Sequence, residues 1–227
     1  MPETTSFQHL FQASLGGDGV TMAPAMALAL DTHFGGLPGW RDAFTAECKT
    51  GREGVDYGVL VFRPGAGALC VVRAADPAGL VDGDLPILAL DCSAPGGVNH
   101  FLAHIDWAAV YARYAEAVHA AGEPFGAGLD AVETSACLFD VRRAGVYQQA
   151  ASVIPGAQWR DPSVVSTWAA ELASDCAVLV YCVYGHEVSR VTALRLRAAG
   201  VNARYLQGGI DGWVAAGRPT SGKPAQR

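Results

Sequence analysis

The sequence has little charge: 17% of its 227 residues are Asp, Glu, Lys or Arg, whereas 51% are hydrophobic. This composition excludes a disordered chain, because there is ample apolar surface to bury in a core. Basic residues are especially few, with 16 Lys and Arg against 22 Asp and Glu, and they form no run. We therefore expect no nucleic-acid partner.

Long apolar runs and paired cysteine motifs are also absent. The longest apolar runs, such as 177–183, are far shorter than a bilayer span, and residues 1–3 resemble no signal peptide. The six cysteines are scattered, with no CxxC motif and no dense framework. We expect no membrane partner, reduced thiols and a cytoplasmic location.

The acidic residues are concentrated in the first half of the chain. Residues 1–121 hold six basic and 13 acidic residues, and residues 122–227 hold ten and nine. Three Gly and one Pro interrupt every periodic pattern between Gly122 and Gly128. We predict a domain over 1–121, a linker over 122–128, a second domain over 129–219 and a flexible tail over 220–227.

Strand and helix patterns alternate in the second half. Apolar runs predict strands at 136–140, 177–182 and 203–206, with helices over 162–173 and from about 188 to 199. Such alternation is typical of an α/β fold, a parallel sheet flanked by helices.

Cys182 ends the most apolar of these predicted strands. Ligands bind at the carboxyl ends of parallel strands, and the short loop that follows can turn backbone N–H groups toward the sulfur. Those amides and the start of the next helix would favour a thiolate. The alternative from position alone is a small buried apolar side chain.

The second half resembles the rhodanese-like sulfurtransferases over about 129–219. The matching segments are Phe139-Asp140-Val141-Arg142, Ile154-Pro155-Gly156-Ala157, Val180-Tyr181-Cys182 with Gly185, and Leu206-Gln207-Gly208-Gly209-Ile210-Asp211-Gly212-Trp213. The resemblance implies a catalytic Cys182 that carries sulfur as a persulfide, from a small sulfur donor to a thiol or cyanide, without a cofactor. It also implies a substrate-binding loop and two supporting residues. The loop is Val183, Tyr184, Gly185, His186, Glu187 and Val188, and the supporting residues are Asp140 and Arg142.

The loop departs from members of the family that use thiosulfate. Those members usually carry Arg where this sequence has Val183 and Glu187. A carboxylate near the sulfur would oppose a dianionic donor, so we expect thiosulfate to be a poor substrate. His186 could compensate, or Glu187 could pair with Arg190 and point away. The loop is similar to a variant in chromate-resistance proteins, so a binding or sensing module for an oxyanion or soft metal is the alternative.

The first half predicts an α+β domain. Helices are expected over 23–33, from 40 and over 107–121, with an antiparallel three-stranded sheet of 57–63, 68–74 and 87–91. From about 15 to 116 it resembles the C-terminal domain of iron/manganese superoxide dismutases. The resemblance rests on Leu28-Ala29-Leu30-Asp31-Thr32-His33-Phe34-Gly35-Gly36, Trp40-Arg41-Asp42-Ala43-Phe44, Pro86-Ile87-Leu88-Ala89-Leu90-Asp91 and Ile105-Asp106-Trp107.

The dismutase resemblance implies a metal held by three His and one Asp, and only Asp91 stands at such a position. His100 and His104, four residues apart, are the remaining candidates beside it. One Asp does not make a redox metal site, so we predict a metal-free domain that serves as a scaffold or homodimer interface. Because these metal ligands are missing, we do not expect superoxide dismutation.

Overall fold

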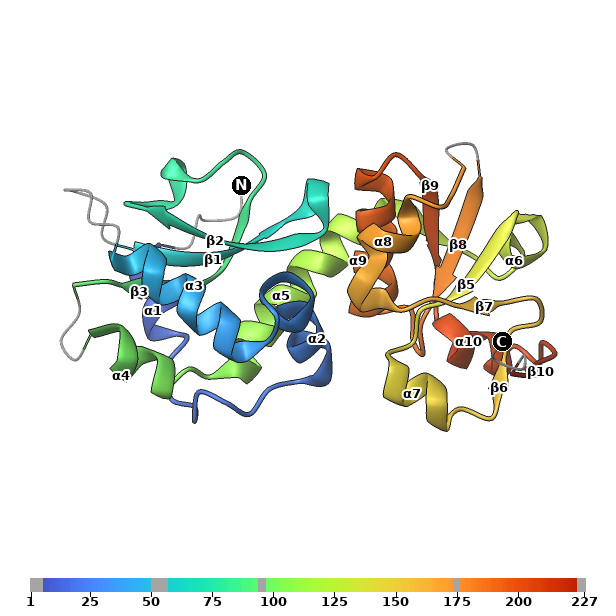
Figure 1. Ribbon diagram of the computed structural model, residues 1–227, viewed down its shortest axis with the longest axis horizontal. Coiled ribbons are helices and arrows are strands. Elements are labelled where there is room, and N and C mark those ends of the chain that lie inside the picture. Colours follow the sequence, from blue (N-terminus) through green and yellow to red (C-terminus); the bar gives the residue numbers. More distant parts are fainter. Residues whose placement is uncertain (1–5, 50–56, 94–96, 174–175, 224–227) are drawn as a thin grey trace. The chain divides into compact units, whose positions relative to one another are not determined.

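The chain folds as two units in the computed structural model, which describes residues 6–49, 57–93, 97–173 and 176–223 (Figure 1). One unit comprises residues 1–64 and 68–117, and the other comprises 65–67 and 118–227. The division falls within helix α5 (Trp107–Gly122), directly before the glycine-rich stretch of the sequence.

The N-terminal unit is built on a three-stranded antiparallel sheet in the order β2-β1-β3. Its strands are β1 (Tyr57–Arg63), β2 (Ala68–Ala74) and β3 (Leu85–Asp91). Its helices are α1 (Phe7–Gln12), α2 (Pro24–Phe34), α3 (Leu37–Lys49), α4 (Gly97–Ala103) and the first part of α5. The predicted antiparallel sheet is therefore present.

Local sequence explains where these elements begin and end. Pro24 occupies the first turn of α2, where its missing N–H costs nothing. Gly35 ends the helix in the left-handed conformation, with φ of 72°. The central strand β1 buries side chains on both faces: Val59 and Val61 pack with Phe7 of α1, and Phe62 meets Tyr114 of α5 edge to face at 5.7 Å.

The C-terminal unit contains a five-stranded parallel sheet in the order β4-β9-β8-β5-β7. Its strands are β4 (Gly126–Ala127), β5 (Cys137–Asp140), β7 (Gln158–Trp159), β8 (Ala177–Tyr181) and β9 (Asn202–Leu206). Its helices are α6 (Ala131–Thr134), α7 (Ala144–Gln149), α8 (Val165–Ala169), α9 (Glu187–Ala198) and α10 (Gly209–Ala215). The predicted parallel sheet flanked by helices is confirmed.

Alternate side chains of the parallel strands enter two separate cores. Val178 and Val180 pack with Trp168 and Leu196 from α8 and α9. Leu179 and Tyr181 face the other way and pack with Ile210 and Trp213 of α10. Because both faces are covered, the strands read as continuous apolar runs in the sequence.

Three boundaries differ from the prediction. Gly126 and Ala127, assigned to the linker, form the edge strand β4 because their backbone pairs with β9. Ser221 and Gly222, assigned to the tail, form β10 and pair with β6 (Ser152–Val153); residues 224–227 of that tail lie outside the described residues. The predicted helix over 162–173 is shorter in the structure: the 3₁₀ turn η4 (Pro162–Val164) precedes α8, which ends at Ala169. After Ala169 the amides of Glu171 and Leu172 donate to carbonyls three residues earlier, as in tighter turns.

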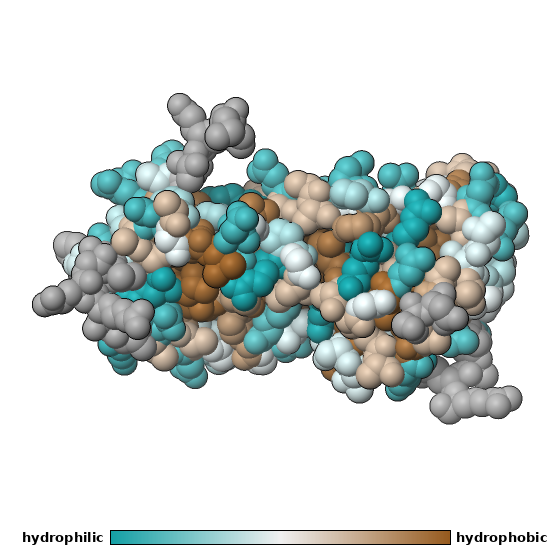
Figure 2. Space-filling view, turned by 90° about the horizontal axis from the view of Figure 1, so that it is seen from above, coloured by the Kyte–Doolittle hydropathy of each residue, from teal (hydrophilic) through white to brown (hydrophobic). Residues whose placement is uncertain are grey.

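In the described part of the chain, no helix is both long and apolar enough to cross a bilayer. Hydrophilic and hydrophobic residues are interspersed on the visible surface of each unit (Figure 2).

Candidate functional site

Cys182 directly follows β8, at the carboxyl end of the parallel sheet, and is only 6% exposed. Its Sγ lies 3.2 Å from the hydroxyl oxygen of Ser189, a fully buried residue in the first turn of α9. That hydroxyl also lies 3.3 Å from the backbone oxygen of His186. The Ser189 hydroxyl can therefore donate to an anionic sulfur or to the loop. The sequence analysis missed Ser189, and its place in the first turn after the loop was the only available signal.

Two glycines allow the loop after Cys182 to pass close to the start of α10. Gly185 has φ of 72°, and a Cβ atom there would lie 2.6 Å from the Leu206 carbonyl oxygen. A Cβ on Gly209 would lie 2.5 Å from the carbonyl oxygens of Cys182 and Val183. Any side chain at either position would push the loop away from α10.

Backbone hydrogen bonds hold the loop from its carbonyl side. The amides of Ile210 and Asp211 donate to the carbonyls of Cys182 and Val183, both at 3.0 Å. Among the described residues, the loop amides from 183 to 186 donate to no backbone carbonyl. Unused amides in a tight loop before a helix are suited to stabilising an anion.

Glu187, the first residue of α9, is buried with 7% exposure. One carboxylate oxygen lies 2.8 Å from Nε2 of His119, although the two groups are not aligned for a linear hydrogen bond. The His119 ring in turn lies 5.4 Å from that of His186, which lies 5.7 Å from Tyr184. The two positions where arginine was expected thus hold Val183 and the buried carboxylate of Glu187, and the imidazoles of His119 and His186 lie beside that carboxylate's end of the loop.

One prediction paired Glu187 with Arg190, but the two residues have other ion-pair partners. The Arg190 guanidinium donates to the carbonyls of Gly185 and His119, both at 3.0 Å, and contacts Glu123 at 3.4 Å. Arg190 thus braces the loop and the end of α5 while Glu187 pairs with His119. His119 was missed because it lies 67 positions before His186, on the predicted helix that ends the first half of the chain, outside the segments that resemble the rhodanese-like domain.

Asp140 and Arg142 form a buried ion pair at the end of β5, the strand beside β8. Asp140 is fully buried, and its carboxylate receives the Arg142 guanidinium at 2.5–3.0 Å and the Tyr181 hydroxyl at 3.0 Å. Burial, together with the Asp140 charge, raises the pKa of Tyr181. The Arg142 guanidinium also donates to the Ser152 carbonyl at 2.9 Å. These contacts fit the predicted supporting role.

A cavity of about 300 Å³ lies beside the residue that follows Cys182. Arg142 and Asp211 supply its charges, and most of the remaining lining is apolar. It is lined by Arg142, Ala150, Ala151, Ser152, Val183, Ile210, Asp211 and Val214. A small molecule with an uncharged body fits this lining.

Two of the metal candidates of the N-terminal unit come together, since the rings of His100 and His104 lie 4.4 Å apart, but no third ligand is grouped with them among the described residues. His104 Nδ1 lies 2.7 Å from the His100 carbonyl, and the Asp91 carboxylate accepts from the Ser93 amide and hydroxyl. In the described ranges, no three His, Cys, Asp or Glu side chains are grouped to hold a metal ion. The described residues therefore do not fit the iron or manganese of the dismutase family, and Asp91 with His100 and His104 is wrong as a substitute site.

The family model described as a rhodanese-like domain matches residues 125–216. Among curated proteins, the chain is similar to the superoxide dismutase (Fe) of Cupriavidus metallidurans, with 31% identity over 113 residues. That match covers 45% of this chain and 57% of the dismutase, so the chain spans little more than half of that relative.

Two solved structures are similar to the chain over less than half of its length. The full-length protein from Lactobacillus plantarum is 24% identical with a TM-score of 0.41, over 44% of this chain and 90% of that one. A rhodanese-related protein from Thermoplasma volcanium is 20% identical with a TM-score of 0.37, over 42% and 96%. The resemblance stated for the C-terminal half is thus confirmed by the family match, which begins at 125 rather than 129 and therefore includes β4.

Proposed function

Residues 125–216 form a rhodanese-like domain, and from this premise we propose that the protein transfers sulfane sulfur through a persulfide on Cys182. The observation that carries the proposal is the position of this sulfur, at the carboxyl end of β8, 3.2 Å from the Ser189 hydroxyl and directly before a loop whose amides donate to no backbone carbonyl among the described residues. Such a cradle favours a thiolate and the anionic persulfide formed from it.

Sulfur transfer proceeds by two displacements. The Cys182 thiolate attacks the outer sulfur of the donor, whose bond to that sulfur breaks as the leaving group departs with the electron pair. An acceptor thiolate or cyanide then attacks the outer sulfur of the persulfide and releases the Cys182 thiolate. The Ser189 hydroxyl, 3.2 Å from Sγ, can donate to this sulfur while it is the thiolate, before the first displacement and after the second.

The donor is proposed to carry less negative charge than thiosulfate. Glu187 brings a buried carboxylate to the loop, and its His119 partner neutralises it only when the imidazole is protonated. The cavity beside Val183 is mostly apolar. A low-molecular-weight persulfide or a mercapto acid fits this environment better than a compact dianion.

Cyanolysis tests this function directly. The full chain is assayed with thiosulfate, mercaptopyruvate and glutathione persulfide as donors, beside Cys182→Ser and a control, Cys70→Ser, whose thiol lies on β2 of the N-terminal unit. We expect thiocyanate from the wild type and Cys70→Ser and none from Cys182→Ser. Equal background turnover by all three proteins with every donor would exclude the proposal.

The second candidate is a binding or sensing module for an oxyanion, such as chromate, or a soft metal ion. Val183 and Glu187 favour it because they stand where catalytic arginines are expected, and Cys182 is only 6% exposed. Calorimetric titration with chromate and with Cu(I) separates the two functions. Binding that is lost in Cys182→Ser, without sulfur transfer, would favour this second function.

For the N-terminal unit we propose a dismutase-like scaffold that carries no metal and joins two copies of the chain. The curated similarity and the missing ligand cluster support this role. Metal analysis of purified protein should find no stoichiometric iron or manganese, and sedimentation should find a homodimer. A bound metal ion together with superoxide dismutation would contradict the metal-free domain. A monomer would contradict the role in joining two copies.

A further inference from the structure

Two cysteines meet at the amino ends of neighbouring strands in the C-terminal unit. Cys137 is the first residue of β5, and Cys176 directly precedes β8. These strands are adjacent and parallel, with Cys137 in register with Val178. The two Sγ atoms lie 2.8 Å apart, although the residues are 39 positions apart in the sequence.

This separation is close to that of a covalent bond. A disulfide has an S–S distance of about 2.05 Å, so a movement of roughly 0.8 Å closes the gap between the Cys137 and Cys176 sulfurs. Both residues lie at the start of packed, hydrogen-bonded strands, which keep the two sulfurs together. Thiols that the fold already aligns have lost most of the entropy that closing a loop costs.

The surroundings hold both thiols in place without sealing them off. Both are half-buried and pack against the core that contains Val178 and Val201, with Phe125 and Leu172 also at its margin. A small oxidant can reach half-buried sulfur, whereas a bulky protein thiol is hindered. The geometry therefore favours reaction of the two thiols with one another.

We propose that Cys137 and Cys176 form a reversible disulfide, a covalent modification site at the end of the sheet opposite Cys182. Cys182 stands six positions after Cys176, and at about 3.3 Å per residue of extended strand the two residues are roughly 20 Å apart. The pair therefore does not exchange directly with a Cys182 persulfide. The proposal stands independently of the sulfur-transfer function.

Formation of the disulfide is a two-electron oxidation by a peroxide. One thiolate attacks an oxygen of hydrogen peroxide, the O–O bond breaks, and a sulfenic acid and hydroxide form. The second thiolate attacks the sulfenic sulfur and displaces hydroxide, which takes up a proton to give water. In total, two thiols and one peroxide give one disulfide and two waters. A dithiol reductant reverses the step by thiol–disulfide exchange, returning two hydrogens.

The disulfide would stabilise the C-terminal unit. It closes a chain segment that runs from β5 through α7, β7 and α8 to the start of β8. Cross-linking a loop of this length removes conformations from the unfolded chain, so the melting temperature should rise on the order of 10 °C. Oxidation at this pair would therefore be read out as stability, without any change at the sulfur-transfer loop.

Peptide mapping of the full chain tests the proposal. Trypsin places Cys137 in peptide 114–142, while Cys176 shares peptide 161–190 with Cys182. The experiment therefore uses a Cys182→Ser background, so that each peptide keeps one cysteine. After brief treatment with one equivalent of hydrogen peroxide and alkylation, we expect the two peptides linked, two hydrogens lighter than their sum, and separated by dithiothreitol.

Variants supply the control and a second readout. Adding Cys137→Ser to the Cys182→Ser background should abolish the oxidative rise in melting temperature, whereas adding Cys70→Ser should retain it. Recovery of peptides 114–142 and 161–190 unlinked after oxidation, or linked only to other cysteines, would overturn the proposal. If Cys137→Ser does not fold, the peptide map of Cys182→Ser alone decides.

Discussion

The Asp140→Ala substitution tests the buried ion pair that Asp140 forms with Arg142 at the end of β5. It removes the carboxylate from Arg142, whose side chain is only 6% exposed and keeps one described acceptor, the Ser152 carbonyl at 2.9 Å. It also removes an acceptor from the buried Tyr181 hydroxyl. Leaving a buried charge uncompensated costs about 3–5 kcal/mol in the free energy of unfolding.

That loss should be large on the temperature scale. The C-terminal unit has roughly 110 residues, and each kcal/mol lowers the melting temperature of such a unit by about 4 °C or more. Asp140→Ala should therefore lower the calorimetric transition of this unit by roughly 12 °C or more.

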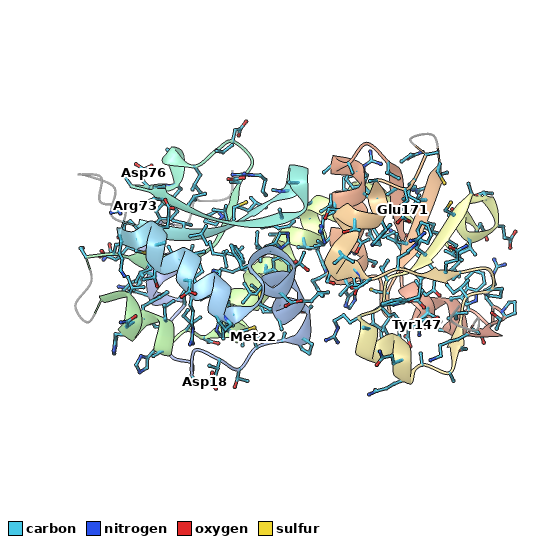
Figure 3. All side chains as sticks on the ribbon, viewed as in Figure 1. Asp18, Met22, Arg73, Asp76, Tyr147 and Glu171 are labelled. Atoms are coloured by element: carbon cyan, nitrogen blue, oxygen red, sulfur yellow. The ribbon has the colours of Figure 1, made fainter. Side chains whose placement is uncertain are left out.

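The matched control removes an exposed ion pair from the same unit. Arg160 lies 3.0 Å from Glu171, and their side chains are 31% and 56% exposed (Figure 3 labels Glu171). Glu171→Gln should cost at most about 1 kcal/mol, because solvent screens the pair. If Asp140→Ala destabilises the protein no more than Glu171→Gln, the reasoning about buried charge is refuted.

A double mutant separates charge from packing. In Asp140→Ala/Arg142→Met no uncompensated charge remains, so the protein should regain a substantial part of the stability lost in the single mutant. A double mutant as unstable as Asp140→Ala would show that the cavity, and not the uncompensated buried charge of Arg142, causes the loss.

Three further predictions concern charge. Glu187→Gln should raise kcat/KM for thiosulfate about tenfold relative to mercaptopyruvate, because a repulsion of ~1.4 kcal/mol is removed; an unchanged ratio of the two donors would contradict this. The pKa of Cys92 is lowered to about 7 because its sulfur accepts a hydrogen bond from the Cys48 thiol. The rate of alkylation at Cys92 should therefore reach half of its maximum near pH 7. Cys48→Ala should move that midpoint to higher pH. The pKa of Asp18, which is labelled in Figure 3, is lowered to about 2 by hydrogen bonds from the Thr21 hydroxyl and backbone amide. The ionised Asp18 therefore stabilises the fold fully above pH 3.8, and this contribution is lost as the pH falls through about 2. Thr21→Val should raise the midpoint of the Asp18 titration measured by NMR.

Local patterns in the sequence predict most of the elements. Continuous apolar runs mark β5 and β8 because both faces of a parallel sheet are covered, and the hairpin after Arg63 follows from Pro64 and Gly67. The helix after the loop ends at Ala198, two residues before Gly200, whose φ is 85°. The alternation of these elements places Cys182 at the carboxyl end of the sheet, so the candidate nucleophile follows from order along the chain.

Segment boundaries at the edges of the C-terminal unit depended on pairing with distant strands. Gly126 and Ala127 read as a linker, since two residues carry no periodicity, and only their hydrogen bonds to β9 make them a strand. Ser221 and Gly222 likewise become ordered by pairing with β6. Short edge strands have no local signal, because their stability comes from the partner strand.

By itself, the sequence determined the antiparallel sheet of the first unit, the longer strands and helices of the second and the position of Cys182 at the end of β8, because these follow from local periodicity and from motifs near Cys182. Only the tertiary structure brought His119 to Glu187 and Cys137 to Cys176. Both pairs join residues far apart along the chain, and nothing in the local pattern of either residue specifies its partner. Contacts of this kind are set by how the strands and helices pack, so they are decided by the fold.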